Sequence, residues 1–201
     1  LMSEDVVATL KSIKKFGIKV RMHKDYCEIF GNGINGFKYK GDLTINAKNS
    51  GTLGRLILGL LIKSPKKIKI MGDKSLSKRD FSRVTIPLEK FGAKFYYKIK
   101  NKLPLSILGS RSVKGIKYLE NKGSAQCKSS VMLAALNASG TTSIKAKKSR
   151  NHSELLFKYL KIPTKIKRTK KYDFIEIKQP KKIRAFNYQI PGDISSSAFF
   201  M

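Results

Sequence analysis

Two segments of the chain are apolar on every face, and this constrains the fold more than any other feature. Residues 53–62 and 131–136 contain no charged side chain except Arg55. A helix without a polar face must be buried on all sides. Around these segments Lys alternates with apolar residues, as in residues 37–40 and 67–70, which is typical of strands with one solvated face. The sequence therefore predicts an inside-out arrangement, in which buried helices are enclosed by sheets whose outer faces meet water.

An internal repeat organises these segments. Each unit is expected to contain an apolar helix, a short strand, an amphipathic helix and a pair of alternating strands. The apolar helices are predicted to begin near Ser50, Ser124 and Ser195, at offsets of 74 and 71 residues. The period is therefore a little over 70 residues.

The ends of the amphipathic helices give the same period. Gly17 and Gly92 stand where a left-handed residue would end a helix, and Lys161 is the equivalent position of the third unit. The offsets between these three residues are 75 and 69. Two independent landmarks thus support the repeat.

The charge of the chain is unusual, since 43 Lys and Arg against 13 Asp and Glu give a net charge of +30. Such a charge is compatible with binding to nucleic acid. However, the lysines are spread along the whole chain and only 8 of the 43 basic residues are Arg, the usual reader of phosphates and guanine edges. We interpret the lysines as a solvated surface and expect no nucleic-acid partner.

Other features narrow the class of protein. The longest uninterrupted apolar run, residues 56–62, is far shorter than the roughly 18 residues of a membrane span, and acidic Glu4 and Asp5 do not suit a signal peptide. Cys27 and Cys127 lie far apart without metal-ligand spacing, so neither a disulfide framework nor a zinc site is expected. A cytoplasmic protein is the prediction. Both ends of the sequence also read as cuts within a longer protein.

Three polar segments lie where helices are predicted to begin, and free backbone N–H groups at such positions favour anions. They are residues 49–55, 72–79 and 123–130. Residues 149–154 form a similar polar segment after the next predicted strand. Arg79 and Arg150 are suited to clamp a carboxylate or phosphate. If the helices are parallel, their positive ends converge on one face and form a site for a small, multiply anionic molecule.

Each of these segments also has a plain structural interpretation. The first is compatible with an ordinary helix cap, and Arg79 with a solvated loop. Asn151 and Glu154 fit a capping box. His152 lacks a surrounding ligand cluster, so no metal site is expected, and Cys127 has no neighbouring base that would make it a nucleophile.

Five motifs, in order over essentially the whole chain, resemble those of the EPSP synthases (3-phosphoshikimate 1-carboxyvinyltransferases). Residues 49–55 resemble N-[AS]-G-T-x-x-R, residues 72–79 resemble G-D-x-S-L-x-x-R, and residues 124–129 resemble S-A-Q-x-K-S. Residues 149–154 are similar to S-R-D-H-T-E and residues 191–198 to P-G-D-x-S-S-A. The resemblance implies an α/β (α+β) fold of two domains, each built from three βαβαββ units with buried parallel helices enclosed by mixed sheets.

In this family, residues 1–201 would be most of the first domain, without its start and without the second domain. The resemblance implies transfer of an enolpyruvyl group from phosphoenolpyruvate to the 5-hydroxyl of shikimate-3-phosphate, with no metal or organic cofactor, by an enzyme that is monomeric when complete. The family's acid and base carboxylates would lie in the second domain, so no catalytic residue is assigned here and the isolated chain is expected to be inactive.

The resemblance also assigns binding residues. Those matching phosphoenolpyruvate contacts are Gly51, Arg79 and Gln126. Those matching shikimate-3-phosphate contacts are Ser124, Ala125, Gln126, Ser149 and Arg150. The small residue at Gly51 implies that the complete enzyme is inhibited by glyphosate.

The sequence departs from the family pattern at three positions. Asp80 replaces the Pro that usually follows Arg79 and places a carboxylate beside an anion clamp. Asn151 replaces an Asp and Ser153 a Thr, which are milder changes.

Besides a decayed or isolated fragment without activity, two alternatives stay open at the level of sequence. The first is the sister enzyme UDP-N-acetylglucosamine enolpyruvyl transferase, although Lys74 occupies the position of that enzyme's reactive Cys. The second is a Lys-rich nucleic-acid-binding module, which would be retained on heparin or DNA regardless of shikimate-3-phosphate.

Overall fold

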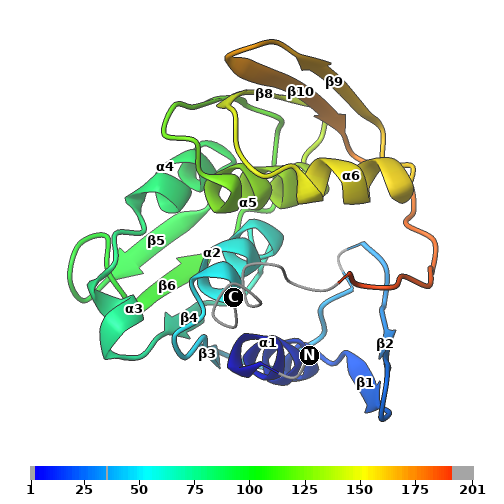
Figure 1. Ribbon diagram of the computed structural model, residues 1–201. Helices are drawn as coiled ribbons and strands as arrows, with labels where there is room; N and C mark the ends of the chain where they lie inside the picture. The colour runs from blue at the N-terminus through cyan, green and yellow to red at the C-terminus, as the bar shows by residue number, and fades with distance from the viewer. Residues whose placement is uncertain (1–2, 35, 192–201) are drawn as a thin grey trace, which may run out of the picture.

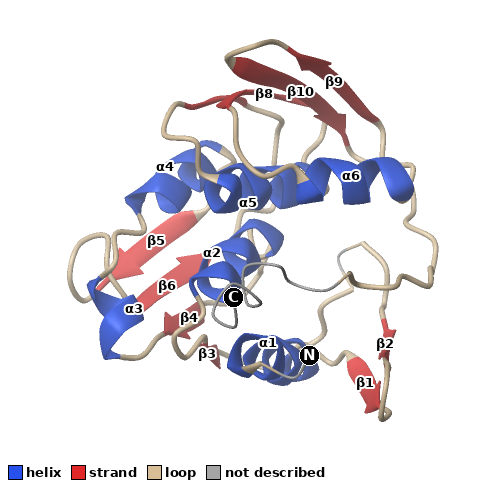
Figure 2. Ribbon diagram, in the orientation of Figure 1, coloured by secondary structure: helices blue, strands red, loops and turns tan. Residues whose placement is uncertain are grey.

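A computed structural model describes residues 3–34 and 36–191, and it contains both helices and strands (Figures 1 and 2). The elements follow in the order α1 (Glu4–Lys15), β1 (Lys19–Met22), β2 (Cys27–Phe30), β3 (Leu43–Asn46), α2 (Gly51–Leu60), β4 (Ile68–Met71), α3 (Lys74–Lys78), α4 (Ser82–Lys90), β5 (Lys94–Tyr97), β6 (Leu105–Leu108), β7 (Lys117–Glu120), α5 (Ala125–Ala135), β8 (Thr141–Lys147), α6 (His152–Tyr159), β9 (Thr164–Arg168) and β10 (Tyr172–Lys178).

The predicted repeat is confirmed by the sheet topology. The described residues form two four-stranded sheets, ordered β3-β4-β6-β5 and β7-β8-β10-β9, and a two-stranded sheet of β1 and β2. In each larger sheet the first pair is parallel and the other pairs are antiparallel. Each sheet therefore belongs to one βαβαββ unit, with the short helix α3 added before α4 in the first of them.

The buried layer is made by α2 and α5, which pack against each other between the two sheets (Figure 1). Thr52 contacts Gln126 near the start of both helices, and farther along Gly59 faces Ser130. Because the second contact lies closer to the C-terminus than the first on both helices, the two helices run parallel. Their N-termini therefore point to the same side of the molecule, as the sequence predicted.

The helix boundaries follow local signals in the sequence. The Ser50 side chain accepts a hydrogen bond from the backbone N–H of Leu53, and the Ser124 side chain accepts one from that of Cys127. Both are N-caps of the kind that Ser favours. The third predicted start, near Ser195, and residues 192–198 of the last motif lie outside the described residues.

The amphipathic helices end as predicted. Gly17 and Gly92 have φ of +74° and +100°, and Lys161, at the equivalent position, has φ of +53°. These are left-handed conformations that satisfy the last helical carbonyl groups. Lys161 thus adopts the same left-handed conformation as the two glycines, although it is not a glycine.

Candidate active site

Arg55, in the second turn of α2, is the centre of a group of polar side chains at the N-terminal ends of the buried helices. Its Nη1 donates a hydrogen bond of 3.0 Å to Oε1 of Gln126 on α5, and the Gln126 Nε2 donates one of 2.9 Å to Oγ1 of Thr52. The guanidinium also lies 5.0 Å from the centre of the Phe81 ring. These contacts fix the orientation of the Gln126 amide and join the first turns of α2 and α5.

Gly51 lies next to the guanidinium groups of two arginines. A Cβ atom added at Gly51 would be 2.8 Å from Nη1 of Arg55 and 3.3 Å from Nη1 of Arg79. The small residue therefore lets both guanidinium groups approach the start of α2. The structure thus brings the predicted residues Gly51, Arg79 and Gln126 together around Arg55, which the sequence had not singled out.

The site is electropositive. Burial lowers the pKa of Arg55, and the charges of Arg79 and Arg83 lower it further, while Cys127 and Asp80 oppose this effect. Like charges that repel one another at the positive ends of helices are stabilised by an anion placed between them. The arrangement is therefore suited to phosphate or carboxylate groups.

Asp80, which stands in the place of the family's Pro, is hydrogen-bonded to Ser82, the first residue of α4. Its Oδ1 accepts a hydrogen bond of 2.9 Å from the backbone N–H of Ser82, and its Oδ2 accepts one of 2.6 Å from the Ser82 hydroxyl. Partial burial alone would raise its pKa, but these bonds and the charges of Arg55 and Arg83 outweigh burial, so the pKa of Asp80 is lowered. The carboxylate therefore remains ionised and offsets part of the positive charge of the site.

Glu120, at the end of β7, shapes the turn that leads into α5. Its buried carboxylate accepts hydrogen bonds from the backbone N–H groups of Lys122, at 3.2 Å, and Gly123, at 2.6 Å, and pairs with Arg83 at 3.0 Å. Gly123 has φ of +71°, a conformation that favours glycine. This turn places Ser124 as the cap of α5, with Ala125 and Gln126 in its first turn.

The loop that contains Ser149 and Arg150 lies beside the start of α5. The backbone carbonyl of Arg150 accepts a hydrogen bond of 3.0 Å from Nζ of Lys128, and a Cβ atom at Gly123 would be 3.3 Å from the Lys148 carbonyl oxygen. The Arg150 side chain is exposed, whereas Oγ of Ser149 is buried and has no hydrogen-bond partner among the described residues. All the predicted binding residues therefore lie on one side of the molecule, around the starts of α2 and α5.

The predicted capping box of α6 is wrong. Asn151 makes no side-chain hydrogen bond to the helix, and Glu154 is buried and pairs with Lys128 instead. The sequence contained one signal for this contact, because Lys128 is a lone charge in an otherwise buried helix. Arg55 carries the same signal in α2.

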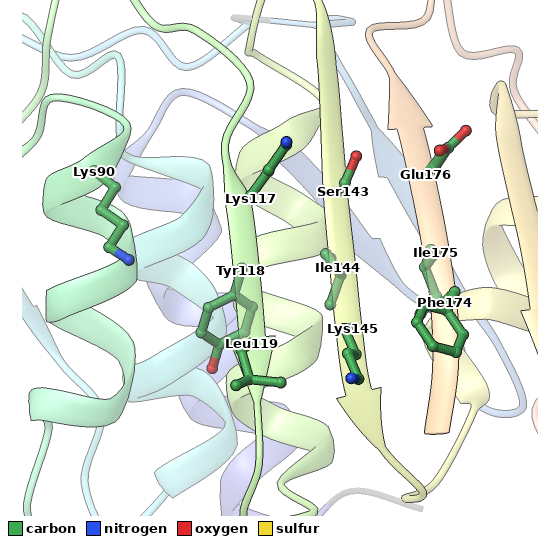
Figure 3. A pocket seen from close by; sticks show the side chains of 10 residues that line it. All are labelled: Lys90, Lys117, Tyr118, Leu119, Ser143, Ile144, Lys145, Phe174, Ile175 and Glu176. Carbon is green, nitrogen blue, oxygen red and sulfur yellow. The ribbon is translucent and has the colours of Figure 1, made fainter. Parts of the chain in front are cut away.

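A separate cavity of about 420 Å³ lies on the outer face of the second sheet, and it contains none of the predicted site residues (Figure 3). Its lining includes Lys90 of α4 and outward-facing Lys117, Lys145 and Phe174 (Figure 3). It is an open depression between solvated side chains on the opposite side of the sheet from α5.

No group of three or more His, Cys, Asp or Glu side chains within residues 3–34 and 36–191 is placed to hold a metal ion. Over the same residues, each helix is too short or too polar to cross a bilayer.

The fold and the site together define a class of α/β proteins in which βαβαββ units direct the N-termini of buried parallel helices toward one electropositive site with arginines beside it. Comparison with known proteins identifies the family within this class. The sequence model of EPSP synthase (3-phosphoshikimate 1-carboxyvinyltransferase) matches residues 1–201. The chain therefore belongs to the EPSP synthase family.

Individual relatives agree with this assignment. The 3-phosphoshikimate 1-carboxyvinyltransferase of Ruthia magnifica is 40% identical over 202 residues, and that of Streptococcus pyogenes serotype M1 is 36% identical over 205 residues. These matches cover 100% of the chain but only 45% and 46% of the relatives. The solved EPSP synthase of Acinetobacter baumannii superposes with a TM-score of 0.88 at 34% identity, covering 100% of this chain and 44% of that one. The chain thus spans a little under half the length of the proteins that it matches.

Proposed function

We propose that this chain provides substrate-binding groups for the transfer of an enolpyruvyl group from phosphoenolpyruvate to shikimate-3-phosphate. In this reaction the 5-hydroxyl of shikimate-3-phosphate loses its proton as its oxygen bonds to C2 of phosphoenolpyruvate, and a proton adds to C3. The tetrahedral adduct then loses phosphate and a C3 proton to give 5-enolpyruvylshikimate-3-phosphate. Each reactant carries a phosphate and a carboxylate, so the site must hold several negative charges at once.

One observation supports this proposal above the others. Gly51, Arg79 and Gln126 meet around the partly buried guanidinium of Arg55, at the N-terminal ends of two parallel helices. Fixed cations and backbone N–H groups arranged in advance stabilise a ligand's negative charge without having to reorganise. Membership of the family then indicates which anions these are.

The residues divide into two binding groups in this proposal. Gly51, Arg79 and Gln126 bind phosphoenolpyruvate. Ser124, Ala125, Gln126, Ser149 and Arg150 bind shikimate-3-phosphate. The resemblance assigns Gln126 to both groups. Its Oε1 accepts a hydrogen bond from Arg55 and its Nε2 donates one proton to Thr52, which leaves the second Nε2 proton for a substrate.

We further propose that residues 1–201 form most of the first domain of a two-domain enzyme, cytoplasmic and monomeric when complete. The share of the relatives that the chain covers supports the first point. Cys27 and Cys127 are both free thiols, which supports a reducing compartment. The sister enzyme is less favoured, because Lys74 is a lysine in the first turn of α3 rather than a reactive Cys.

The proposal is tested by calorimetric titration of the protein expressed from its complete reading frame. We expect binding of shikimate-3-phosphate and inhibition by glyphosate that competes with phosphoenolpyruvate. Arg79→Gln should weaken phosphoenolpyruvate binding, while Arg111→Gln, a control on another loop, should not. Binding of UDP-N-acetylglucosamine in place of shikimate-3-phosphate would favour the sister enzyme and contradict the proposal.

A further inference from the structure

A buried ion pair joins α5 to α6 close to the proposed site. Nζ of Lys128 lies 2.6 Å from Oε1 of Glu154, and the two side chains are 0% and 2% exposed. Charged side chains are almost never fully buried unless they are paired. The position of this pair in the interior therefore calls for a physical reason.

Stability alone does not provide that reason. Removing two charges from water costs about as much free energy as their attraction returns, so an apolar pair of similar volume is often equally stable or more stable. An apolar residue at position 128 would also fit the rest of α5, whose neighbouring positions Cys127, Val131 and Met132 are buried. What an apolar residue does not provide is a hydrogen-bond donor.

Lys128 uses that donor on the loop before α6. Besides pairing with Glu154, its Nζ donates a hydrogen bond of 3.0 Å to the backbone carbonyl of Arg150. One ammonium group thus connects three segments, namely the first turns of α5, the first turn of α6 and the loop between β8 and α6. Glu154 holds the ammonium in place.

A second contact fixes the same two helices. Oγ of Ser129 and Oγ of Ser153 lie 2.6 Å apart, next in sequence to the two members of the ion pair. The Arg150 side chain itself is exposed. The position of this side chain therefore depends on the Arg150 backbone, whose carbonyl is held by the hydrogen bond from Lys128.

We propose that Lys128 and Glu154 are positioning residues, which hold Ser149 and Arg150 beside Ser124 and Gln126 so that they bind the phosphorylated cyclohexene substrate. Both side chains are buried beneath the loop and act through Arg150 rather than by touching the substrate. This inference rests on the proposed function. It adds that the geometry of the loop between β8 and α6 depends on one interior ion pair.

The experiment compares three variants of the protein expressed from its complete reading frame. The double variant Lys128→Met/Glu154→Leu removes both charges without leaving either one unpaired, and it deletes the donor to Arg150. Glu154→Gln keeps an acceptor for Nζ but removes the negative charge. Lys147→Met is the matched control, because it makes the same change at an exposed position of β8.

The expected result is a selective loss. In the double variant KM for shikimate-3-phosphate should rise roughly tenfold, the scale of coupling between residues in contact, while KM for phosphoenolpyruvate stays within about twofold of the wild type. Amide hydrogen exchange at residues 148–151 should become faster. Glu154→Gln should shift both readouts in the same direction by less, and Lys147→Met should shift neither.

Two outcomes would overturn the inference. One is an unchanged KM for shikimate-3-phosphate with unchanged exchange at residues 148–151. The other is an equal rise in both KM values, which indicates a general structural role. If the double variant does not fold, Glu154→Gln decides by the same criteria. Should the wild type turn over neither substrate, the proposed function fails, yet hydrogen exchange still tests whether the ion pair orders the loop.

Discussion

The close approach of the two buried helices makes a quantitative prediction for the variant Gly59→Ala. An added Cβ atom would lie 2.1 Å from the backbone oxygen of Ser130 and 3.1 Å from its Oγ, whereas ordinary contact begins at 3.4 Å. The obstacle is backbone in a buried helix, so no side-chain rotation relieves it. The helices α2 and α5 would have to separate locally by about 1.3 Å.

The free energy of unfolding should fall as a result. Overfilling a packed core costs about 1–3 kcal/mol, and occasionally more. The better helix propensity of Ala than Gly offsets about 1 kcal/mol of this cost. Because the clash is with main chain, we expect the upper part of that range and a net loss of about 2 kcal/mol, which for a protein of this size lowers Tm by roughly 4–8 °C.

The assay is urea unfolding followed by circular dichroism, together with a thermal scan. Gly31→Ala is the matched control, because a Cβ atom there meets nothing within 4 Å and its φ is not left-handed. The control should unfold at the wild-type urea concentration. If Gly59→Ala proves as stable as the wild type, with an unchanged dependence on urea, the inferred contact between the helices is incorrect.

Three further predictions follow from the site and its surroundings. Gly51→Ala should fold normally but weaken phosphoenolpyruvate binding, because its methyl group displaces the flexible guanidinium of Arg55; calorimetry with unchanged affinity would contradict this. The pKa of Asp80 is lowered in the folded state, so the ionised Asp80 carboxylate stabilises the fold above about pH 4, and this effect is lost as the pH falls further. The variant Asp80→Asn should therefore lose less stability between pH 5 and about pH 3 than the wild type. Burial raises the pKa of the Tyr118 hydroxyl, so above about pH 10 Tyr118 ionises in the unfolded chain but not in the folded one, and stability should decline. Tyr118→Phe should reduce this decline in urea unfolding, and an identical decline would refute the reasoning.

Much of the fold was predictable because its signals are local. A helix without a polar face must be buried, and serine caps and left-handed C-terminal residues mark where helices begin and end. These signals recur about every 70 residues, so they also predicted the βαβαββ unit. The motifs containing Gly51, Arg79 and Gln126 were visible for the same reason, since each lies within a few residues of a helix start.

The capping box predicted for α6 shows where local reasoning fails. Asn151 and Glu154 have the spacing of a capping box, and in an isolated helix Glu154 would fold back on the backbone. In the protein, the charged Lys128 is buried within reach, and a buried charge without a partner costs more than a lost cap. The Glu154 carboxylate therefore pairs with Lys128 instead of capping the helix.

The sequence by itself determined which helices are buried, where they begin, the period of the repeat and the family. The burial and the starts of the helices, and each separate motif, depend on residues a few positions apart, whose interactions are fixed by backbone geometry. Only the tertiary structure decided that Arg55 is the centre of the site, that Asp80 stands among arginines and that Lys128 holds the Arg150 loop. These contacts join segments 22 to 71 residues apart, and their strength depends on burial, which exists only once the helices and sheets have packed.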